Sequence, residues 1–186
     1  MNTQLPKYLE IRDTAKYGKG VFATCDIKKG EVIYMLDGEI ISFDKCIERI
    51  RSGDEDQTDS LQVGLELDMD LDAISRTFNH SCNPTCLLRR TSEMYSIRDI
   101  KAGEEITYDY SATIGPNIPE SLWAMNCLCG SFNCRKKLGN VLTIPKDQLD
   151  TYSELGGLQD YIVGELSRIR IEDGKYILPK YRTINL

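Results

Sequence analysis

The chain has 186 residues, of which 41% are hydrophobic and 28% are charged, as in an ordinary globular domain. Its formal net charge of −6 disfavours direct nucleic-acid binding, because that function needs a basic surface. The first residues lack the apolar core of a signal peptide, and no stretch approaches the roughly 20 apolar residues of a membrane helix. We therefore expect an intracellular protein, nuclear if eukaryotic, and cytoplasmic or in a host cell if bacterial or viral.

Short strands and tight turns dominate the first half of the chain. Strands are predicted over residues 7–12, after the glycine-bearing turn within residues 15–23, after the turn at Gly30, and over residues 38–42. A helix is predicted between Ser42, which can cap its first turn, and Gly53, which can end it. Its apolar residues recur at helical spacing: Phe43, Cys46, Ile47 and Ile50.

Strands are predicted again within residues 61–73 and over residues 93–100. The stretch "DIKAGEEITYDY" nearly repeats "DIKKGEVIY", which lies 73 residues earlier, and each copy places a glycine turn before a strand. Such repetition indicates similar corners in a fold of short strands. From Ile144 onward the spacing is mostly helical, with a break at Gly156 and Gly157 and a final short strand within residues 175–184.

Acidic residues concentrate in "DEDQTD" at residues 54–59 and in "ELDMDLD" at residues 66–72. One interpretation is a solvated loop and face, which is the usual role of such runs. The other is a surface that attracts a partner rich in lysine or arginine. The sequence leaves both open.

The seven cysteines fit poorly with a closed disulfide framework, because their number is odd. Cys127, Cys129 and Cys134 lie close together in "CLCGSFNC", where Gly130 lets the chain fold back, and three such thiolates can hold one zinc ion. The alternative is three buried thiols without a metal. A structural zinc site takes a fourth ligand, and the candidates in "FNHSCNPTC" are His80, Cys82 and Cys86.

The segments "YGKGVFA", "FNHSCNPTC", "GEEITYDY" and "CLCGSFNCR", in this order and spacing, resemble the SET-domain protein lysine methyltransferases. The resemblance covers roughly Tyr8 to Leu138. It implies a mainly β (β-rich α+β) fold of several small curved antiparallel sheets with a pseudoknot that brings residues 78–82 beside residues 106–110. It also implies a SET domain over residues 1–122, a post-SET zinc segment over 123–140, and a C-terminal helical appendage over 141–186.

The resemblance also implies a site for S-adenosylmethionine, with S-adenosylhomocysteine as the product. The cofactor-binding residues it implies are Lys19, Gly18, Gly20, Arg76, Phe78, Asn79, His80 and Tyr110. Glycines suit the turn at residues 18–20, because the backbone can approach a ligand where no Cβ intervenes. Cys82 matches the position of the fourth zinc ligand, which completes the set Cys82, Cys127, Cys129 and Cys134. His80 is then a hydrogen-bonded residue whose backbone serves the adenine, and Cys86 is a spare core thiol or, as the less favoured alternative, a ligand.

The catalytic residues implied by the resemblance are Tyr110, the catalytic tyrosine, and Tyr108, whose identity relates to the number of methyl groups added. Tyr34 is a further candidate for the pocket. A tyrosine at position 108 can hold a water that crowds a methylated amine, so we expect mono- or dimethylation. Thr85 stands where the family usually has a second asparagine, so the hydrogen bonding differs there.

The expected function is transfer of a methyl group from S-adenosylmethionine to a lysine of a basic protein or peptide, such as a histone tail. One alternative is a catalytically silent module, stabilised by zinc, that binds a basic peptide. A zinc-ribbon nucleic-acid binder is a weaker alternative, because the chain is acidic and lacks a basic strip with aromatic residues.

Overall fold

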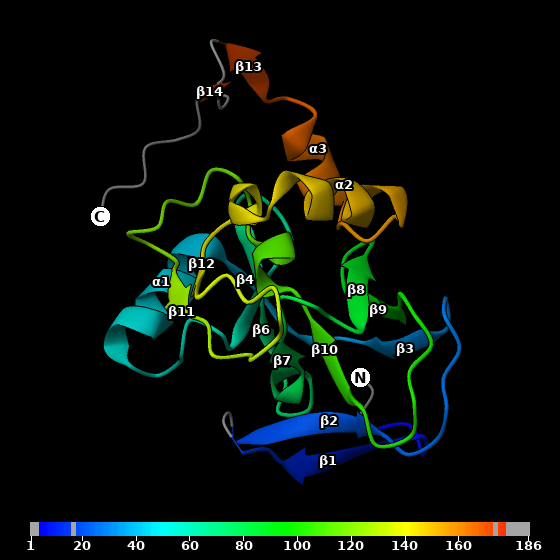
Figure 1. The fold of residues 1–186 in the computed structure, drawn as a ribbon. Coiled ribbons are helices and arrows are strands. Elements are labelled where there is room, and N and C mark those ends of the chain that lie inside the picture. The colour runs from blue at the N-terminus through cyan, green and yellow to red at the C-terminus, as the bar shows by residue number, and fades with distance from the viewer. Residues whose placement is uncertain (1–3, 16–17, 173–174, 178–186) are drawn as a thin grey trace.

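The computed structural model describes residues 4–15, 18–172 and 175–177. Small antiparallel sheets make up most of it, and short helices lie at its edges (Figure 1), which confirms the expected fold class. The last predicted strand is present over β14, Lys175–Ile177, and the rest of that prediction lies outside the described residues. Among the described residues, no helix combines the length and the apolar character needed to cross a bilayer.

A four-stranded sheet has the order β1 (Leu9–Asp13), β2 (Lys19–Ala23), β10 (Glu105–Tyr108) and β7 (Asn79–His80). Two three-stranded sheets follow the orders β3 (Val32–Met35), β9 (Glu93–Ser96), β8 (Cys86–Arg89), and β4 (Gly38–Ser42), β6 (Leu67–Leu71), β5 (Ser60–Gln62). The two hairpins are β11 (Met125–Asn126) with β12 (Lys137–Leu138), and β13 (Arg170–Glu172) with β14. The α-helices are α1 (Phe43–Ser52), α2 (Lys146–Glu154) and α3 (Asp160–Leu166), and short 3₁₀ turns span Ser75–Thr77, Tyr110–Thr113 and Val141–Thr143.

Helix α1 begins and ends where its sequence predicts. The Ser42 side chain accepts a hydrogen bond from the Lys45 amide, which satisfies one of the free N–H groups of the first turn. Gly53 ends the helix with a φ of 80°, a left-handed conformation that glycine adopts without steric cost. The end of α1 therefore depends on local sequence alone.

The two repeated segments lie against each other and make reciprocal contacts. Ile27 and Ile100 exchange both backbone hydrogen bonds, each 2.9 Å long. Lys28 pairs with Asp99 of the second copy, and Lys101 pairs with Asp26 of the first. The near-repeat therefore builds matched corners that hold β2 and β10 next to each other.

The C-terminal helices cover the sheet that contains β8 and β9 (Figure 1). Leu87 and Tyr95 from that sheet share a buried apolar cluster with Tyr152 of α2 and Ile162 of α3. The Tyr95 hydroxyl also donates a 2.8 Å hydrogen bond to the Leu155 carbonyl just after α2. Residues 141–166 thus complete the core of the same folded unit.

A buried polar centre lies where β5 meets α3. The Gln62 side-chain oxygen accepts hydrogen bonds from the Gly115 amide at 2.7 Å and the Tyr161 hydroxyl at 3.1 Å. The Gln159 side chain donates to the Gln62 carbonyl at 3.2 Å. Asp68, the cross-strand partner of Gln62 on β6, is only 4% exposed.

Asp68 and Asp70 have opposite electrostatic environments although they lie two residues apart on β6. The Asp70 carboxylate contacts the guanidinium groups of both Arg49 and Arg76. The Asp68 atom Oδ2 is buried without a hydrogen-bond partner, and burial raises the pKa of Asp68 to about 7. Because its ionised form is disfavoured in the fold, this group costs stability as the pH rises from about 4 to 7.

We predict that Asp68→Asn raises the free energy of unfolding, and that the gain at pH 8 exceeds the gain at pH 5 by about 2 kcal/mol. The reason is that the folded chain keeps Asp68 largely protonated at pH 5 and must bury its charge at pH 8. Urea unfolding at the two pH values measures the difference. Glu66→Gln, which removes an exposed carboxylate two residues before Asp68, is the control. An equal gain at both pH values for Asp68→Asn would contradict the assignment of a buried, titrating acid.

Candidate functional site

The centre of the site is the parallel pairing of β7 with β10. Asn79 lies opposite Thr107 and His80 lies opposite Tyr108, although the paired residues are 28 positions apart in sequence. The Ser81 amide extends this contact by donating to the Tyr108 carbonyl at 3.1 Å. This pairing confirms the expected placement of residues 78–82 beside residues 106–110.

A cavity of about 260 Å³ opens beside these strands. Five of the predicted cofactor-binding residues line it: Lys19, Arg76, Asn79, His80 and Tyr110. Gly18, Gly20 and Phe78 lie close in sequence to these residues and do not line the cavity. Sequence reasoning missed the other lining residues, which are Thr58, Thr77, Met125, Asn126 and Cys127. Cys127 was expected only as a metal ligand, and the others carry no pattern that marks a site.

The glycine turn before β2 approaches the cavity because Asn79 holds it there. The Asn79 amide donates to the Lys19 carbonyl at 2.9 Å and to Glu105 Oε1 at 2.8 Å. A Cβ at Gly20 would lie 2.4 Å from Glu105 Oε1 and 2.9 Å from the Asn79 nitrogen, so a side chain there would displace both groups. Gly18 adopts a φ of 71°, a left-handed backbone conformation that glycine reaches without the steric cost a side chain would bring.

Tyr110 links the cavity to both paired segments. Its hydroxyl donates to the Phe78 carbonyl at 2.9 Å, and its backbone amide donates to His80 Nδ1 at 3.2 Å. The Tyr108 ring lies 4.8 Å from the Tyr110 ring, centroid to centroid. Burial raises the pKa of the Tyr108 hydroxyl well above its usual value, so the group stays neutral. The expected aromatic cluster is therefore present.

Tyr34 does not line the cavity. It is 3% exposed, and its ring stacks against Phe78 with a centroid distance of 5.2 Å. Tyr34 therefore supports the Phe78 backbone, to which Tyr110 bonds, from the core side.

Two cationic side chains stand at the cavity wall. Arg76 pairs with Asp70 and lies 3.4 Å from Asp59, while Lys19 lies 3.3 Å from Asp13. Both cations have donors left over after these contacts, since a guanidinium carries five N–H groups and an ammonium three. The wall can therefore receive a carboxylate.

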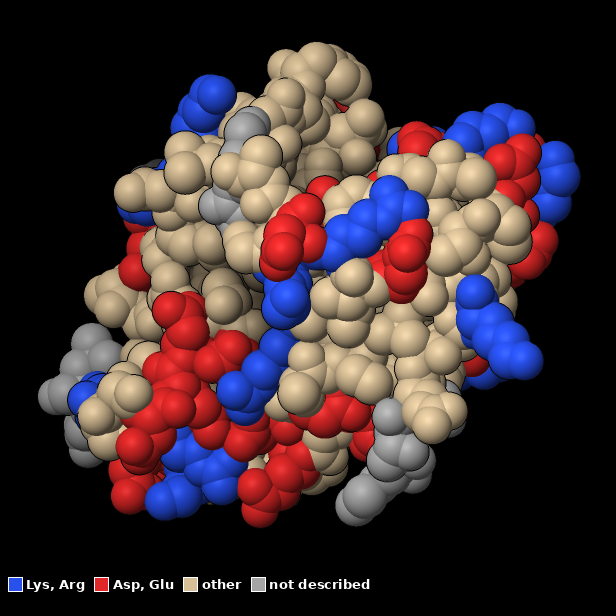
Figure 2. All heavy atoms as spheres, turned by 90° about the horizontal axis from the view of Figure 1, so that it is seen from below, with Lys and Arg blue, Asp and Glu red and all other residues tan. Residues whose placement is uncertain are grey.

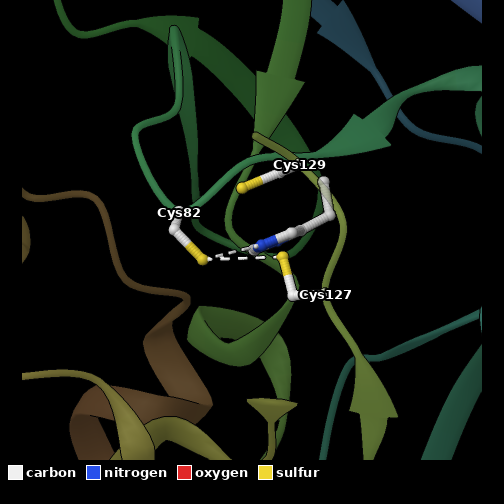
Figure 3. A group of neighbouring side chains, drawn as sticks. Cys82, Cys127 and Cys129 are labelled. Atoms are coloured by element: carbon white, nitrogen blue, oxygen red, sulfur yellow. Dashed lines mark hydrogen bonds between the residues drawn. The ribbon is translucent and has the colours of Figure 1, made fainter. Parts of the chain in front are cut away.

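A group of potential metal ligands closes one end of the cavity. The ligand atoms of His80, Cys82, Cys127 and Cys129 all lie within 4.8 Å of one another. Figure 3 shows the labelled cysteine side chains: Cys82 comes from one segment, Cys127 and Cys129 come from another, and all three converge on a common space. The Cys82 and Cys127 sulfurs are 3.7 Å apart, and the Cys134 sulfur lies 3.6 Å from that of Cys127.

These sulfur separations fit tetrahedral zinc. A Zn–S bond of about 2.3 Å places two ligands of a tetrahedron about 3.8 Å apart. The mutually close group holds four candidate ligands, His80, Cys82, Cys127 and Cys129, and Cys134 is a fifth candidate through its contact with Cys127, for a site that takes four. The donor set is rich in sulfur, which suits zinc in a structural role.

The position of the ring hydrogen distinguishes His80 from the cysteines as a possible metal ligand. Burial lowers the pKa of His80 to about 4, so its ring is neutral near pH 7. Because Nδ1 accepts the Tyr110 amide, the ring carries its single hydrogen on Nε2. Nε2 lies 3.3 Å from the Cys82 sulfur. His80 therefore donates a hydrogen bond to Cys82 and has no lone pair at Nε2 for a metal.

A buried ion pair joins the cysteine segment to the tyrosine strand. Both guanidinium NH₂ groups of Arg135 bond to the Asp109 carboxylate at 2.6 Å, and the Arg135 amide lies 3.4 Å from the Cys82 sulfur. From α2, the Tyr152 hydroxyl reaches Asp109 at 3.2 Å and Gln148 reaches the Cys82 carbonyl at 2.7 Å. Sequence reasoning assigned these supporting residues no role, because their partners lie far along the chain.

The remaining residues singled out from the sequence have structural positions. Cys86 is fully buried in the main core, as expected of a spare thiol, and burial raises its pKa to about 12. Thr85 connects two strands: its hydroxyl accepts from the Thr107 amide at 2.9 Å and donates to the Glu105 carbonyl at 3.2 Å. The Thr85 hydroxyl thus ties the start of β8 to β10.

The sequence of the chain is similar to one protein family and to several known proteins. The SET domain family model matches residues 18–111. The histone-lysine N-methyltransferase ASHH3 of Arabidopsis thaliana is 32% identical over 154 residues, which cover 75% of this chain and 40% of that protein. A human histone-lysine N-methyltransferase named as H3 lysine-36 specific is 33% identical and covers 75% of this chain and 5% of its own length. One from Schizosaccharomyces pombe, named as H3 lysine-4 specific, is 35% identical and covers 69% and 15%. The chain spans less than half the length of these relatives.

We predict that the purified chain binds one zinc ion, and that Cys134→Ser loses most of it whereas His80→Gln retains it. The reason is that the His80 tautomer leaves four cysteines as the ligand set. Inductively coupled plasma mass spectrometry after dialysis measures the stoichiometry, and a chelator is expected to lower the melting temperature of the native chain. Cys25→Ser, at an exposed cysteine outside the cluster, is the matched control. Full zinc in Cys134→Ser together with its loss in His80→Gln would reverse the ligand assignment.

Proposed function

The chain belongs to the SET-domain family, and we propose that it transfers methyl groups from S-adenosylmethionine to a lysine side chain of a basic protein. SET methyltransferases use this cofactor. One observation carries the proposal: the cavity collects Tyr110, Asn79, His80 and the glycine-turn residue Lys19, which distant segments contribute. The chain matches only part of each relative, so the activity in their names is a proposal for this chain.

The cofactor fits the chemistry of the cavity wall. Its carboxylate matches the spare donors of Arg76 and Lys19, and its amino group and adenine match backbone and amide groups at residues 79–80. When bound, it supplies a methyl group that a positively charged sulfur makes electrophilic. The residues of the chain bind and orient the reactants, so no nucleophilic side chain is required.

The aromatic residues would prepare the lysine for attack. Free lysine has a pKa of about 10.4, so it arrives as an ammonium. A dry aromatic channel beside a second positive charge disfavours that form, and the proton leaves to water. Tyr110 and Tyr108 would hold the neutral amine in line with the methyl group that the bound cofactor would supply. Alignment of two reactants can supply several kcal/mol, up to roughly 7–11 in model systems.

The proposed zinc ion has a structural role. The thiolates of Cys82, Cys127, Cys129 and Cys134 would hold it and so fix the cysteine segment beside β7. Because Cys127 also lines the cavity, the same contact would complete one wall of the cofactor site. Coordination by four protein ligands leaves no open position, so the metal would not take part in the chemistry.

The proposed substrate is a basic tail such as that of a histone, and with such a substrate the proposed location is the nucleus if the chain is eukaryotic. Acidic and basic side chains crowd together on part of the face shown in Figure 2, and acidic ones are prominent there. The relatives are named for two different lysines of histone H3, so the target lysine differs within the family. A net charge of −6 favours association with a cationic tail.

We predict that Tyr110→Phe lowers the rate of methyl transfer at least 100-fold and leaves cofactor affinity within about threefold, because the hydroxyl orients the reactants and the ring is retained. Transfer from labelled cofactor to an array of lysine-containing peptides measures the rate, and calorimetry measures the affinity.

Tyr95→Phe is the matched control, since it removes a buried hydroxyl whose bond to Leu155 lies outside the cavity. Its transfer rate should stay within about twofold of wild type. Normal transfer by Tyr110→Phe would refute the role of the hydroxyl. Absence of cofactor binding by the wild-type chain would favour a silent peptide-binding module.

We predict mono- and dimethyl-lysine as the main products of the wild-type chain, and a shift toward more highly methylated lysine in Tyr108→Phe. The Tyr108 hydroxyl would hold a water molecule that takes up the room a methylated amine needs, and phenylalanine cannot hold it. Mass spectrometry of the peptide product reads the distribution. If the wild-type chain produced mainly trimethyl-lysine, the proposed role of the Tyr108 hydroxyl would be wrong.

A further inference from the structure

The acidic segment at residues 54–59 forms a hydrogen-bonded turn before β5. The Asp56 carboxylate accepts hydrogen bonds from the Thr58 amide and from the Thr58 hydroxyl, each 3.1 Å long. The Asp59 carboxylate accepts from the Asp56 amide at 2.9 Å, and the Asp59 amide donates to the Asp56 carbonyl at 3.0 Å. Aspartate side chains stabilise turns through such bonds to the nearby backbone. Two acidic side chains of the segment therefore build its shape.

This turn forms one wall of the cofactor cavity. The Leu71 amide, at the end of β6, donates to the Asp59 carbonyl at 2.9 Å and so fixes the turn to the sheet. The Asp59 carboxylate lies 3.4 Å from the guanidinium of Arg76, which lines the cavity. Thr58, one residue earlier, lines the cavity itself. The acidic segment thus belongs to the candidate site through its backbone position.

The opposite wall consists of residues 125–127, and two hydrogen bonds join it to the turn. The Trp123 indole donates to the Gln57 carbonyl, and the Gln57 side chain donates to the Ala124 carbonyl, each at 3.1 Å. These two bonds form a clamp (the Gln57 clamp) between the residues that directly precede the two walls. Thr58 follows Gln57 on one side, and residues 125–127 follow Ala124 on the other.

Trp123 connects the clamp to the cysteine cluster. Its side chain is 8% exposed and shares a buried apolar cluster with Cys82 and Cys127. A small cavity of about 30 Å³ lies between Trp123 and α1, so van der Waals packing across this contact is incomplete. The two directional hydrogen bonds therefore contribute more to the alignment of the walls than they would in a closely packed contact.

We propose that Gln57 is a positioning residue of the cofactor site, which holds residues 125–127 at the correct distance from Thr58. The inference rests on the proposed function, because it takes the cavity as the site of S-adenosylmethionine. Gln57 itself does not line the cavity, so it acts through the wall and not through contact with the ligand. A wall that is already in place does not have to be ordered when the cofactor binds, which favours affinity.

Hydrogen exchange of the ligand-free chain tests the clamp directly. Gln57→Met keeps the length of the side chain and removes the donor to Ala124. In this variant the amides of residues 123–127 should exchange at least threefold faster than in the wild type. Gln4→Met, at an exposed glutamine, is the matched control and should leave their exchange unchanged. Mass spectrometry of peptic fragments measures the rates, and equal rates in Gln57→Met and wild type would overturn the clamp.

Calorimetry with S-adenosylhomocysteine tests the effect on the cofactor site. Gln57→Met should raise the dissociation constant about fivefold, which is the scale of one neutral hydrogen bond. Gln4→Met should keep it within about twofold, and zinc content should stay at the wild-type level in both variants. An unchanged dissociation constant in Gln57→Met would overturn the positioning role. Loss of zinc together with affinity would also overturn it, because Gln57 would then support the fold as a whole.

Methyl transfer separates positioning from a general structural role. With saturating peptide, Gln57→Met should raise the cofactor KM about fivefold and leave kcat within about twofold, because the tyrosines that face the reactants are unchanged. A fall in kcat with an unchanged KM would contradict the proposal.

The outcomes also separate this inference from the proposed function. A wild-type chain that binds the cofactor product and transfers methyl groups, with Gln57→Met equal to it in both, overturns the role of Gln57 alone. A wild-type chain that neither binds S-adenosylhomocysteine nor methylates any peptide overturns the proposed function and, with it, the role of Gln57 in cofactor binding.

Discussion

The ion pair between Asp109 and Arg135 is the interaction on which the rest of the site depends. Asp109 lies between Tyr108 and Tyr110, and Arg135 directly follows Cys134, so the pair ties the tyrosine strand to the cysteine segment. Both side chains are almost fully buried. Removal of one partner from such a pair typically costs about 3–5 kcal/mol, because the other charge is left without compensation. The pair therefore helps to hold the cysteine segment against the strand that carries the tyrosines.

The C-terminal helices extend this support. Tyr152 bonds to Asp109, and Gln148 bonds to the Cys82 carbonyl, so α2 contacts both halves of the joint. Helix α2, which the sequence predicts to be part of a C-terminal appendage, thus supports the candidate site through these hydrogen bonds. The position of α2 in turn depends on the apolar cluster that it shares with β8 and β9.

Two buried aspartates, Asp109 and Asp68, differ in the number of partners that stabilise their charge. Asp109 has a guanidinium, a hydroxyl and a backbone amide as partners. Asp68 has an oxygen with none, and burial raises its pKa to about 7. The first arrangement holds the site rigid. The second leaves a carboxyl group whose charged form is disfavoured in the fold.

The sequence by itself determined the features that depend on neighbours along the chain. It predicted α1 through its capping serine and terminal glycine, the similar corners through the near-repeat, and the cysteine segment through its spacing. Resemblance to a family also pointed to Asn79 and Tyr110, which line the cavity. Only the tertiary structure decided the parallel pairing of β7 with β10, the His80 tautomer, the Arg135 ion pair and the isolation of Asp68. The physical reason is that each of these is set by groups brought together from distant parts of the chain, and burial and hydrogen-bond partners have no periodicity in sequence.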